Sequence, residues 1–388
     1  MSEVRVNNLS NENNTGGPTI SGITTYSGRH FFVPPQGDTA SRPSDCEPGS
    51  LRFNTDSEHL EYFRGNTIGW VEIEAELTAP LGGGTGSNTG VGTRGIFYSG
   101  NVSSDNVIQF VTISTLGDAT DFGDANTPTR VGGSFSSRTR CFKAGGYNDG
   151  GGGKNDIEFV TFASQGNGTD FGDLLSAKWN DCGFSDATRG VAAGGEYPGT
   201  PFFDVIEYVT MSSTGNSVDF GNLIAANQVG QNGAMASSTR GVIAGGYESG
   251  NPAVDRIQFV TISTTGDAAD FGDLTTGQQR TGCCSNAVRG VIGAGSPAGN
   301  LISFITMATL GNAIDFGDST NTDYGKASMN SPTRGIWAGS DNTALDTIEH
   351  VEIATTGNAV DFGDTDVAGA TNGVIRPTGT SSNGHGGL

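Results

Sequence analysis

Residues 240–273 read RGVIAGGYESGNPAVDRIQFVTISTTGDAADFGD, and this stretch decides the fold because its pattern occurs six times in the chain. It contains an apolar run that ends in Gly-Gly, a second run that begins at Ile257, and the tripeptide Asp-Phe-Gly at Asp270. The six Asp-Phe-Gly tripeptides begin at Asp121, Asp170, Asp219, Asp270, Asp315 and Asp361, so that one unit has 45 to 51 residues. A repeat of this period predicts one structural unit used six times.

One spacing within the unit is constant and another varies. An Ile stands thirteen residues before the Asp of every Asp-Phe-Gly, at Ile108, Ile157, Ile206, Ile257, Ile302 and Ile348. An Arg opens the first apolar run, at Arg94, Arg140, Arg189, Arg240, Arg289 and Arg334, and the Ile follows it after 13 to 17 residues. Segments of variable length are typical of surface loops. We therefore expect six loops that leave the repeat domain on one face.

Each unit has four short stretches with the pattern of β-strands and none with helical periodicity. The strand IQFVTIST carries apolar or aromatic residues on both faces, so it must be covered on both faces. The radially stacked blades of a propeller provide such cover. The prediction is an all-β fold with a six-bladed β-propeller over residues 93–378. A β-solenoid is the alternative, although 45–51 residues is long for one solenoid coil.

Over residues 93–364 this pattern resembles the kelch-type propeller repeat, in which an apolar strand ends in Gly-Gly about every 50 residues. The Tyr and Trp that follow Gly-Gly in a kelch blade are missing here, and Asp-Phe-Gly-Asp takes their place. The resemblance implies the architecture and no kelch function. The segment TNGVI at 371–375 imitates TRGVI and offers either a closing strand for the first blade or a shortened edge strand. Residues 379–388 are expected to form a flexible tail.

The composition agrees with a turn-rich β protein, since 63 of 388 residues are Gly. There are 41 acidic and 20 basic side chains, giving a net charge of −21, which disfavours nucleic acid and anionic membranes as partners. No apolar run is long enough to insert in a membrane, and the N-terminus lacks a secretory signal. The five cysteines show no disulfide or zinc spacing, so we expect small buried thiols.

The residues before the repeats form separate segments. Residues 1–34 are rich in Asn, Gly, Ser and Thr and predict an extended arm, and residues 81–92 are a Gly-rich linker. Between them, residues 35–80 contain the strand-like stretches LRFN, HLEYF and GWVEI, separated by turns. This pattern predicts a small β-meander with Phe53, Tyr62 and Trp70 as its core.

The meander resembles a module near the start of bacteriophage tail-fibre, baseplate and other appendage proteins. The matching residues are Arg42-Pro43, Pro48-Gly49, Phe53-Asn54-Thr55-Asp56, Leu60-Glu61-Tyr62 and Trp70-Val71-Glu72-Ile73. With the arm and the Gly-rich repeats, the chain is similar to virion structural proteins of tailed phages such as cyanophages. The resemblance implies a multi-copy or homo-oligomeric virion component, assembled in the host cytoplasm. Its N-terminal part would dock on other virion proteins, and its propeller would be displayed for contact with a host-surface glycan or protein or with a neighbouring subunit.

Asp-Phe-Gly also occurs in the magnesium loop of protein kinases, but six copies without the other kinase motifs exclude that function. We expect each Phe to be the aromatic wedge of a blade, each Gly to permit a turn, and each Asp to accept main-chain N–H groups. Calcium is the alternative, because Asp118, Asp121 and Asp124 offer three carboxylates at a spacing of three residues. No other cofactor is expected.

The six arginines suggest a repeated ion pair or an Arg-to-carbonyl clamp, with a ligand-binding Arg ring as the alternative. No nucleophile motif or metal triad is present, so we expect a non-enzymatic protein, with a propeller hydrolase or lyase as a third hypothesis. The variable loops carry aromatic residues at Tyr147, Tyr197, Phe202, Phe203 and Tyr247. Such residues suit sugar stacking or protein anchoring, or they cover blade edges. A carbohydrate-binding, lectin-like propeller is therefore the alternative function.

Overall fold

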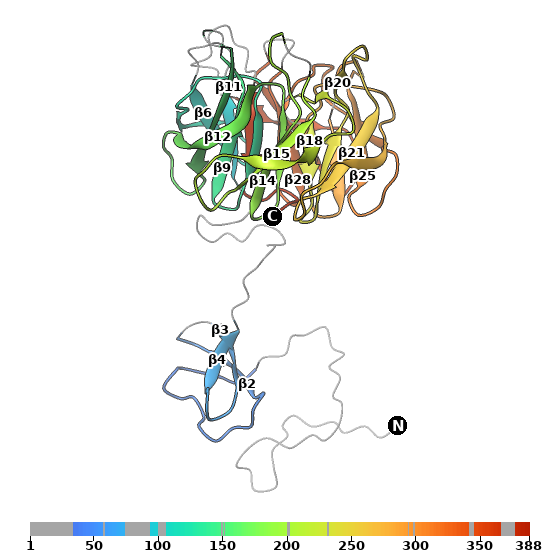
Figure 1. The fold of residues 1–388 in the computed structure, drawn as a ribbon. Helices are drawn as coiled ribbons and strands as arrows, with labels where there is room; N and C mark the ends of the chain where they lie inside the picture. Colours follow the sequence, from blue (N-terminus) through green and yellow to red (C-terminus); the bar gives the residue numbers. More distant parts are fainter. Residues whose placement is uncertain are drawn as a thin grey trace, which may run out of the picture. The chain divides into compact units, whose positions relative to one another are not determined.

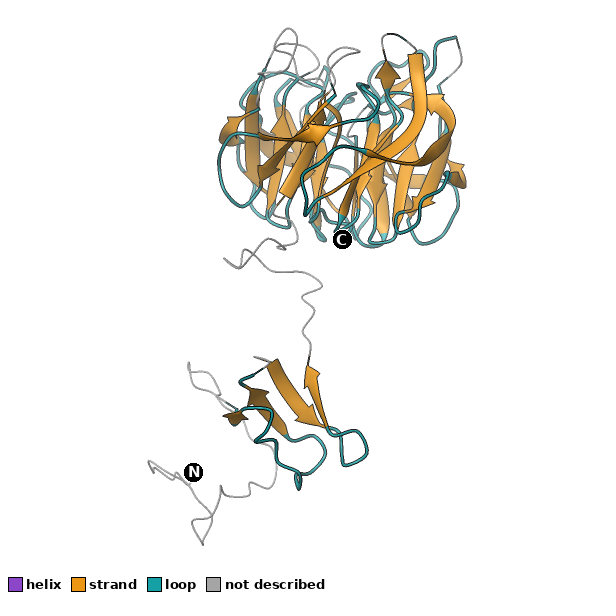
Figure 2. Cartoon of the chain, turned by 90° about the vertical axis from the view of Figure 1, so that its left-hand side faces the viewer, coloured by secondary structure: helices purple, strands orange, loops and turns teal. Residues whose placement is uncertain are grey.

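The structure is a computed structural model that describes residues 34–56, 59–73, 94–99, 106–148, 150, 152–199, 202–230, 233–293, 295–297, 299–340, 345–365 and 377–388. The chain divides into two compact units, Met1–Thr78 and Ala79–Leu388, called here the N-terminal unit and the repeat unit. Both consist of strands and loops, so the all-β prediction is confirmed (Figures 1 and 2). Nowhere in the described ranges is there a helix long and apolar enough to cross a membrane. The linker at 81–92 and the arm, apart from residue 34, lie outside the described residues.

The N-terminal unit contains one four-stranded sheet. Its strands, in spatial order, are β1 (Gln36–Gly37), β2 (Leu51–Asn54), β3 (His59–Phe63) and β4 (Trp70–Ile73). Strands β2, β3 and β4 form the predicted antiparallel meander, and β1 adds to β2 in parallel. The strand assignment from the pattern of LRFN, HLEYF and GWVEI is thus confirmed.

The predicted core of the N-terminal unit is wrong in its membership. Phe53, Tyr62 and Trp70 are only half-buried, whereas the buried side chains of the sheet are Arg52, Asn54, Glu61 and Phe63. Successive side chains of a strand point to opposite faces, so Phe53 and Tyr62 lie on the face opposite to Asn54 and Glu61. A polar network instead fills the covered face, where Arg52 Nη2 donates to the Asp38 carbonyl (3.0 Å) and to Ser41 Oγ (3.4 Å).

The repeat unit contains five four-stranded sheets and one five-stranded sheet, called repeat sheets 1 to 6 in the order in which their second strands occur in the chain. From the innermost strand outward, sheet 1 is β31 (Pro377–Ser382), β5 (Arg94–Ser99), β6 (Val107–Thr112) and β7 (Thr120–Asp124). Sheet 2 is β8 (Gly133–Ser136), β9 (Arg140–Ala144), β11 (Gly152–Thr161) and β12 (Thr169–Lys178), with β10 (Tyr147–Asn148) added to β11. Sheet 3 is β13 (Cys182–Ser185), β14 (Arg189–Ala193), β15 (Val205–Thr210) and β16 (Val218–Asn222).

The other three sheets repeat this order. Sheet 4 is β18 (Ala234–Ala236), β19 (Arg240–Ala244), β21 (Arg256–Thr261) and β22 (Ala269–Asp273). Sheet 5 is β23 (Cys283–Ser285), β24 (Arg289–Ile292), β25 (Leu301–Thr306) and β26 (Ile314–Asp318). Sheet 6 is β27 (Ala327–Asn330), β28 (Arg334–Ala338), β29 (Thr347–Glu352) and β30 (Val360–Asp364). A further pair consists of β17 (Asn227–Gln228) and β20 (Tyr247–Glu248).

The constant spacing of thirteen residues is explained by a hairpin between the third and fourth strands. In sheet 4, Ile257 pairs with Gly272 of Asp-Phe-Gly, and a register shift follows at Gln258. The same pairing and shift occur in the other five sheets. The variable segment connects the second strand to the third, as expected for a loop. One such loop follows β19 and includes β20, at the end of the repeat unit opposite to the C-terminus (Figure 1).

The apolar core lies between neighbouring sheets. Six clusters of buried side chains join sheets 1 and 2, 2 and 3, 3 and 4, 4 and 5, 5 and 6, and 6 and 1. The Phe of every Asp-Phe-Gly is 2–3% exposed and meets the ring of a third-strand residue edge-on, with centroids 5.7–6.1 Å apart. The prediction of an aromatic wedge is confirmed. Four of the five cysteines are buried, and all five are free thiols, as the reading of small buried thiols predicts.

The C-terminal residues correct two expectations. The segment 371–375 lies outside the described residues, and the strand that completes sheet 1 is β31, which pairs antiparallel with β5. Residues 379–388 are therefore not a flexible tail. The Ser, Thr and Gly content suggested a linker, but the innermost strands of other sheets are also rich in small polar residues, such as Ser134, Ser136 and Ser328. Hydroxyl bonds link them: Thr380 donates its N–H to Ser134 Oγ (2.9 Å) and its Oγ1–H to the Ser328 carbonyl (2.8 Å).

Candidate functional site

The six arginines that open the second strands all act between neighbouring sheets. Each guanidinium donates from Nη1 to a main-chain carbonyl of the next sheet: Arg94 to Phe162, Arg140 to Met211, Arg189 to Ile262, Arg240 to Met307, Arg289 to Ile353 and Arg334 to Ile113. Five of them also stack on an aromatic ring, 4.3–5.0 Å from its centroid. The Arg-to-carbonyl clamp is thus the contact that all six units share, whereas the printed ion pair of this set is the one between Arg334 Nε and Glu352 Oε1 (2.8 Å).

The Asp-Phe-Gly segments form a second set of contacts between sheets. The residue after each Gly donates its main-chain N–H to an Asn or Asp of the next sheet, over 2.9–3.1 Å: Asp124 to Asn167, Asp173 to Asn216, Asn222 to Asp267, Asp273 to Asn312, Asp318 to Asn358 and Asp364 to Asp118. Each Gly has a φ of 149–152°, and a Cβ there would overlap a main-chain carbonyl of the next sheet. Glycine is required for this close approach.

These contacts also bear on the calcium hypothesis. Asp118 Oδ1 accepts the N–H of Asp364, which is the contact between sheets 6 and 1. Asp121 and Asp124 are exposed. The part of the chain that the structure describes contains no group of three or more His, Cys, Asp or Glu side chains that could hold a metal ion. Asp118, Asp121 and Asp124 are therefore not gathered into one ligand set, and Asp118 has a structural role.

The two ends of the innermost strands differ. Where these strands end, the last residues of the chain pack among several of the sheets. His385 Nε2 donates to the Ser136 carbonyl (3.1 Å) and lies 3.1 Å from Ser185 Oγ, while the Gly387 N–H donates to His385 Nδ1 (3.1 Å). Burial lowers the pKa of His385 to about 4. This end is called the closed end, and only about 40 Å³ of cavity remains beside it.

At the other end, just before the innermost strands begin, there is a cavity of about 430 Å³. It is called the open-end pocket, and its lining residues are Arg130, Val131, Tyr147, Trp179, Asn180, Glu196, Pro198 and Arg280. They come from the segments that lead into sheets 2, 3 and 5 and from the loops that follow β9 and β14. A concave site of this size with a few polar groups is typical of a small-ligand pocket.

Aromatic rings form one wall of the open-end pocket. The rings of Tyr147 and Trp179 meet edge-on with centroids 4.9 Å apart, and Tyr197 lies 5.8 Å from Trp179. The guanidinium of Arg130 lies over the ring of Tyr147, 5.0 Å from its centroid. Main-chain bridges between Arg130 and Tyr147 and between Trp179 and Glu196 hold these residues in place.

The carboxylate of Glu196 anchors the same wall. Its Oε1 accepts hydrogen bonds from Trp179 Nε1 (2.8 Å), from Asn180 Nδ2 (2.9 Å) and from Gln228 Nε2. Three donors on one carboxylate oxygen fix the orientation of the indole and of the amide. Glu196 therefore positions other residues of the pocket.

The main chain beneath the pocket has an uncommon conformation. Val131, Asn180 and Arg280 have φ values of 57°, 56° and 55°, and they are the non-glycine residues with positive φ in the described part of the chain. Glycines stand near the start of two other innermost strands, at Gly230 (φ 83°) and Gly325 (φ 68°). A left-handed conformation costs about 1–2 kcal/mol for most non-glycine residues. Here it recurs before five of the six innermost strands, and main-chain hydrogen bonds link several of these positions, from the N–H of Asn180 to Val131, of Gly230 to Asn180 and of Gly325 to Arg280. All three non-glycine residues of this kind line the open-end pocket.

A buried carboxyl group lies next to the pocket. Asp181 is 0% exposed; its Oδ1 accepts the N–H of Gly133 (3.2 Å), and its Oδ2 has no hydrogen-bond partner among the described residues. Burial raises the pKa of Asp181 to about 7, against the attraction of Lys178. Lys178 is itself buried and forms an ion pair with Glu207.

The predicted loop aromatics separate into two groups. Tyr147 lines the open-end pocket, whereas Tyr197 is 38% exposed and packs against Trp179 without lining the cavity. Phe202 and Tyr247 instead form a pair of their own, with centroids 5.1 Å apart, and Phe203 faces Lys178 at 6.0 Å. Sequence reasoning missed Trp179, Arg130, Asn180, Glu196 and Arg280. The sequence marks these five residues only as positions that break the repeat, because none of them recurs in all six units.

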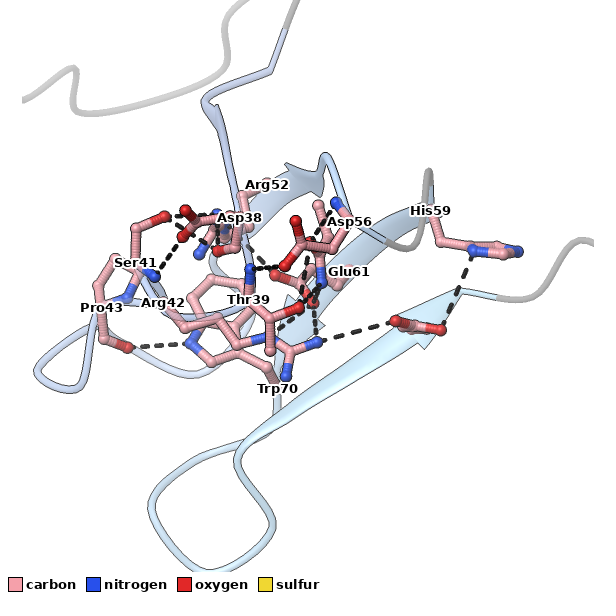
Figure 3. Close-up of polar contacts among 12 residues, drawn as sticks. Asp38, Thr39, Ser41, Arg42, Pro43, Arg52, Asp56, His59, Glu61 and Trp70 are labelled. Atoms are coloured by element: carbon pink, nitrogen blue, oxygen red, sulfur yellow. Dashed lines mark hydrogen bonds and ion pairs between the residues drawn. The ribbon is translucent and has the colours of Figure 1, made fainter.

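The N-terminal unit has two unlike faces. On one, Glu61 is 0% exposed and accepts from Arg42 Nε (2.9 Å) and Nη2 (2.6 Å), with Arg52 Nε at 3.4 Å (Figure 3). The Trp70 indole donates to the Pro43 carbonyl (2.9 Å) on the same face. The opposite face is apolar and partly exposed: Leu51 is 48% exposed, and Phe53, Leu60, Tyr62 and Val71 are half-buried.

No protein-family model matches this chain, and the search of curated proteins found no match to it.

Proposed function

We propose that the six repeat sheets are the blades of a six-bladed β-propeller. The support is that every contact between sheets continues from sheet 6 to sheet 1. Arg334 of sheet 6 donates to the Ile113 carbonyl of sheet 1, Asp364 donates to Asp118, and one apolar cluster joins the two sheets. Strand β31 lies beside both β27 and β8, so the innermost strands neighbour one another in a closed order.

We further propose that the chain is a non-enzymatic component of a phage particle, in which the N-terminal unit docks on another virion protein and the repeat unit is displayed. The observation that carries this proposal is the apolar face of the N-terminal unit. Leu51, Phe53, Leu60, Tyr62 and Val71 lie on one side of a sheet in a unit that is compact by itself. Exposed apolar patches on small units mark interaction surfaces.

A mass-spectrometric inventory of purified particles tests this role. We expect the protein in virions, and we expect a chain that lacks residues 34–73 to be absent from them although the repeat unit still folds. A second variant, Leu51→Glu, places a charge on the apolar face and should reduce incorporation. Absence of the full-length protein from washed particles would contradict the proposal.

The open-end pocket favours carbohydrate binding as a second candidate function. Trp179 and Tyr147 offer ring surface, and the polar side chains of Asn180, Arg130 and Arg280 line the same cavity of about 430 Å³. Amphipathic aromatic rings with a few polar groups suit a sugar, which has both apolar and hydroxyl-bearing faces. A glycan array tests this function, and a binding protein of this kind must give reproducible hits.

A further inference from the structure

We propose that sheet 1 holds a strand-binding site that accepts β31 because residue 381 is small, and that this selects the strand with which the repeat unit closes. The ligand of the site is the chain's own segment Pro377–Ser382, rather than an innermost strand of another sheet or of a second copy of the chain. This inference rests on the closed order of the six sheets proposed above. It depends neither on a role in a phage particle nor on carbohydrate binding.

Five junctions between neighbouring sheets share one contact. The side chain of the second-last residue of an innermost strand lies against the Gly that follows the repeated Arg in the next sheet. These pairs are Phe135 with Gly190, Phe184 with Gly241, Met235 with Gly290, Cys284 with Gly335 and Met329 with Gly95. A Cβ on any of these glycines would lie 1.9–2.4 Å from an atom of the inserted side chain. The next sheet therefore has to carry glycine at this position.

The junction between sheets 1 and 2 has this contact reversed. Its innermost strand, β31, carries Ser381 at the equivalent position, which pairs with Ile96 as Phe184 pairs with Val191. Sheet 2 carries Cys141 where the other five sheets have Gly, and Cys141 is 0% exposed. At this junction the small residue is on the innermost strand, and the larger side chain comes from the next sheet.

Ser381 and Cys141 lie directly against each other. Burial raises the pKa of the Cys141 thiol, and a hydrogen bond with the Ser381 main chain opposes this shift. Ser381 Oγ lies 2.5 Å from the Oγ of Ser136, and Ser136 is the residue that pairs with Cys141 in sheet 2. β31 therefore lies beside both β8 and β9. A hydroxyl and a thiol fill the space that a phenyl ring or a thioether fills at four other junctions.

The reversed contact distinguishes β31 from the other five innermost strands. A strand that brought Phe, Met or Cys to this position beside β5 would press its side chain against Cys141, and overpacking of a buried site is destabilising. In any other sheet, β31 would leave the space at the neighbouring glycine unfilled, which also lowers stability. Strands of similar repeats can pair wrongly, within one chain or between copies. The difference in side-chain size therefore determines which strand completes sheet 1.

The test is a double-mutant cycle on the full chain, measured by calorimetric melting in a reducing buffer. Ser381→Phe should lower the melting temperature of the repeat unit by roughly 5 °C, because the ring has no space beside Cys141. Cys141→Gly alone should also lower it, since a buried side chain is lost. In the Ser381→Phe background, Cys141→Gly should instead raise the melting temperature, because it recreates the contact of Phe184 with Gly241.

A milder variant and a matched control accompany this cycle. Ser381→Cys serves if Ser381→Phe does not fold, because Cys284 already makes the same contact with Gly335, and it should show the same reversal. Cys182→Gly is the control, because Cys182 is a buried thiol of the cluster between sheets 3 and 4. Its effect should be equal in the parent and in the Ser381→Phe variant. Hydrogen exchange should be faster in β31 of Ser381→Phe and slow again when Cys141→Gly is added.

Two outcomes separate this inference from the closed order on which it rests. If Cys141→Gly has an effect of the same sign and size in both backgrounds, the strand-binding site is rejected. A second cycle of Gly95→Ala and Met329→Ala tests the closed order itself, because these two residues join sheets 1 and 6. If Gly95→Ala costs as much with Met329→Ala as without it, the sheets do not close and both proposals fail. Coupling there without a reversal at Cys141 would reject only the strand-binding site.

Discussion

The two ends of the innermost strands show how one repeated scaffold produces two different surfaces. At the closed end, the last residues of the chain pack among the sheets, and His385 is bonded to Ser136 and lies beside Ser185. At the open end, the segments that enter sheets 2, 3 and 5 leave a cavity lined by Trp179 and two arginines. A buried titratable side chain with a shifted pKa lies at each end, His385 at the closed end and Asp181 at the open end, and burial shifts the two pKa values in opposite directions. The strands are alike, so the difference comes from the chain segments that do not repeat.

The largest expected effect comes from removing the closed end. Deletion of residues 377–388 takes away β31, which is the innermost strand of sheet 1 and lies beside β27 and β8. We expect the cooperative unfolding transition of the repeat unit to disappear in calorimetry. Deletion of residues 1–78 is the matched control and should leave that transition within a few degrees, because it removes a separate unit. A deletion variant of 377–388 that melts like the full chain would show that β31 is dispensable.

Asp181→Asn tests the open end. The folded pKa of about 7 lies above the ordinary value of 3.8, so the folded state binds the extra proton between these values and stability falls as pH rises through them. The variant should be more stable than the parent by at most about 4 kcal/mol above pH 7, and the gain should vanish as pH falls towards 4. Urea unfolding at pH 4, 6 and 8 measures this. An equal gain at all three pH values would mean that the buried charge is not the cause.

His385→Gln tests the closed end with the opposite sign. The folded pKa of about 4 lies below the ordinary value of 6.5, so stability is lost as pH falls from 6.5 to 4. Gln keeps a donor for the Ser136 carbonyl but cannot titrate, so about 3 kcal/mol of acid sensitivity should disappear.

In the parent protein the two groups oppose each other over nearly the same pH range. Each single variant should therefore expose the slope of the other group, and the double variant should have neither slope. Stability curves of all four proteins between pH 4 and 8 provide the comparison. A double variant that keeps either slope would contradict the assignment.

The smallest expected effect concerns the strain that is confined to the open end. Val131 has a φ of 57°, where a β-branched residue is unfavourable, whereas Asn180 adopts the same conformation before β13. We expect Val131→Asn to raise the free energy of unfolding by about 1 kcal/mol, measured by urea titration. Val205→Asn, at the half-buried first position of β15 with ordinary backbone, is the control and should give no gain. Equal effects at both sites would remove the strain argument.

The repeats made much of the fold predictable, because a residue with the same structural role in every sheet occurs six times in the sequence. The thirteen-residue spacing marked a segment of constant length, which in the structure is the hairpin that pairs Ile257 with Gly272, and Phe271 is the expected aromatic wedge. The arginines were recognised as structural, although only the structure chose the carbonyl clamp over an ion pair. The same reasoning failed for residues that occur once. Nothing in the sequence periodicity links Trp179 to Arg130 and Arg280, which is why the pocket was missed while Tyr147 and Tyr197 were found only as separate loop residues.

Two further features depended on long-range pairing. The C-terminal strand resembles a linker by composition, and only its place beside β5, β8 and β27 shows that its small hydroxyl side chains bond to those strands. In the N-terminal unit, the patterns LRFN and HLEYF correctly predicted strands. Which face of their sheet is covered depends on the loop that contains Asp38, Ser41 and Arg42. The sequence by itself determined the unit, its strands and its turns, since these are local and repeated. Tertiary structure alone decided how the chain closes, which face is buried and where the pocket lies, because these result from contacts between residues far apart in the chain.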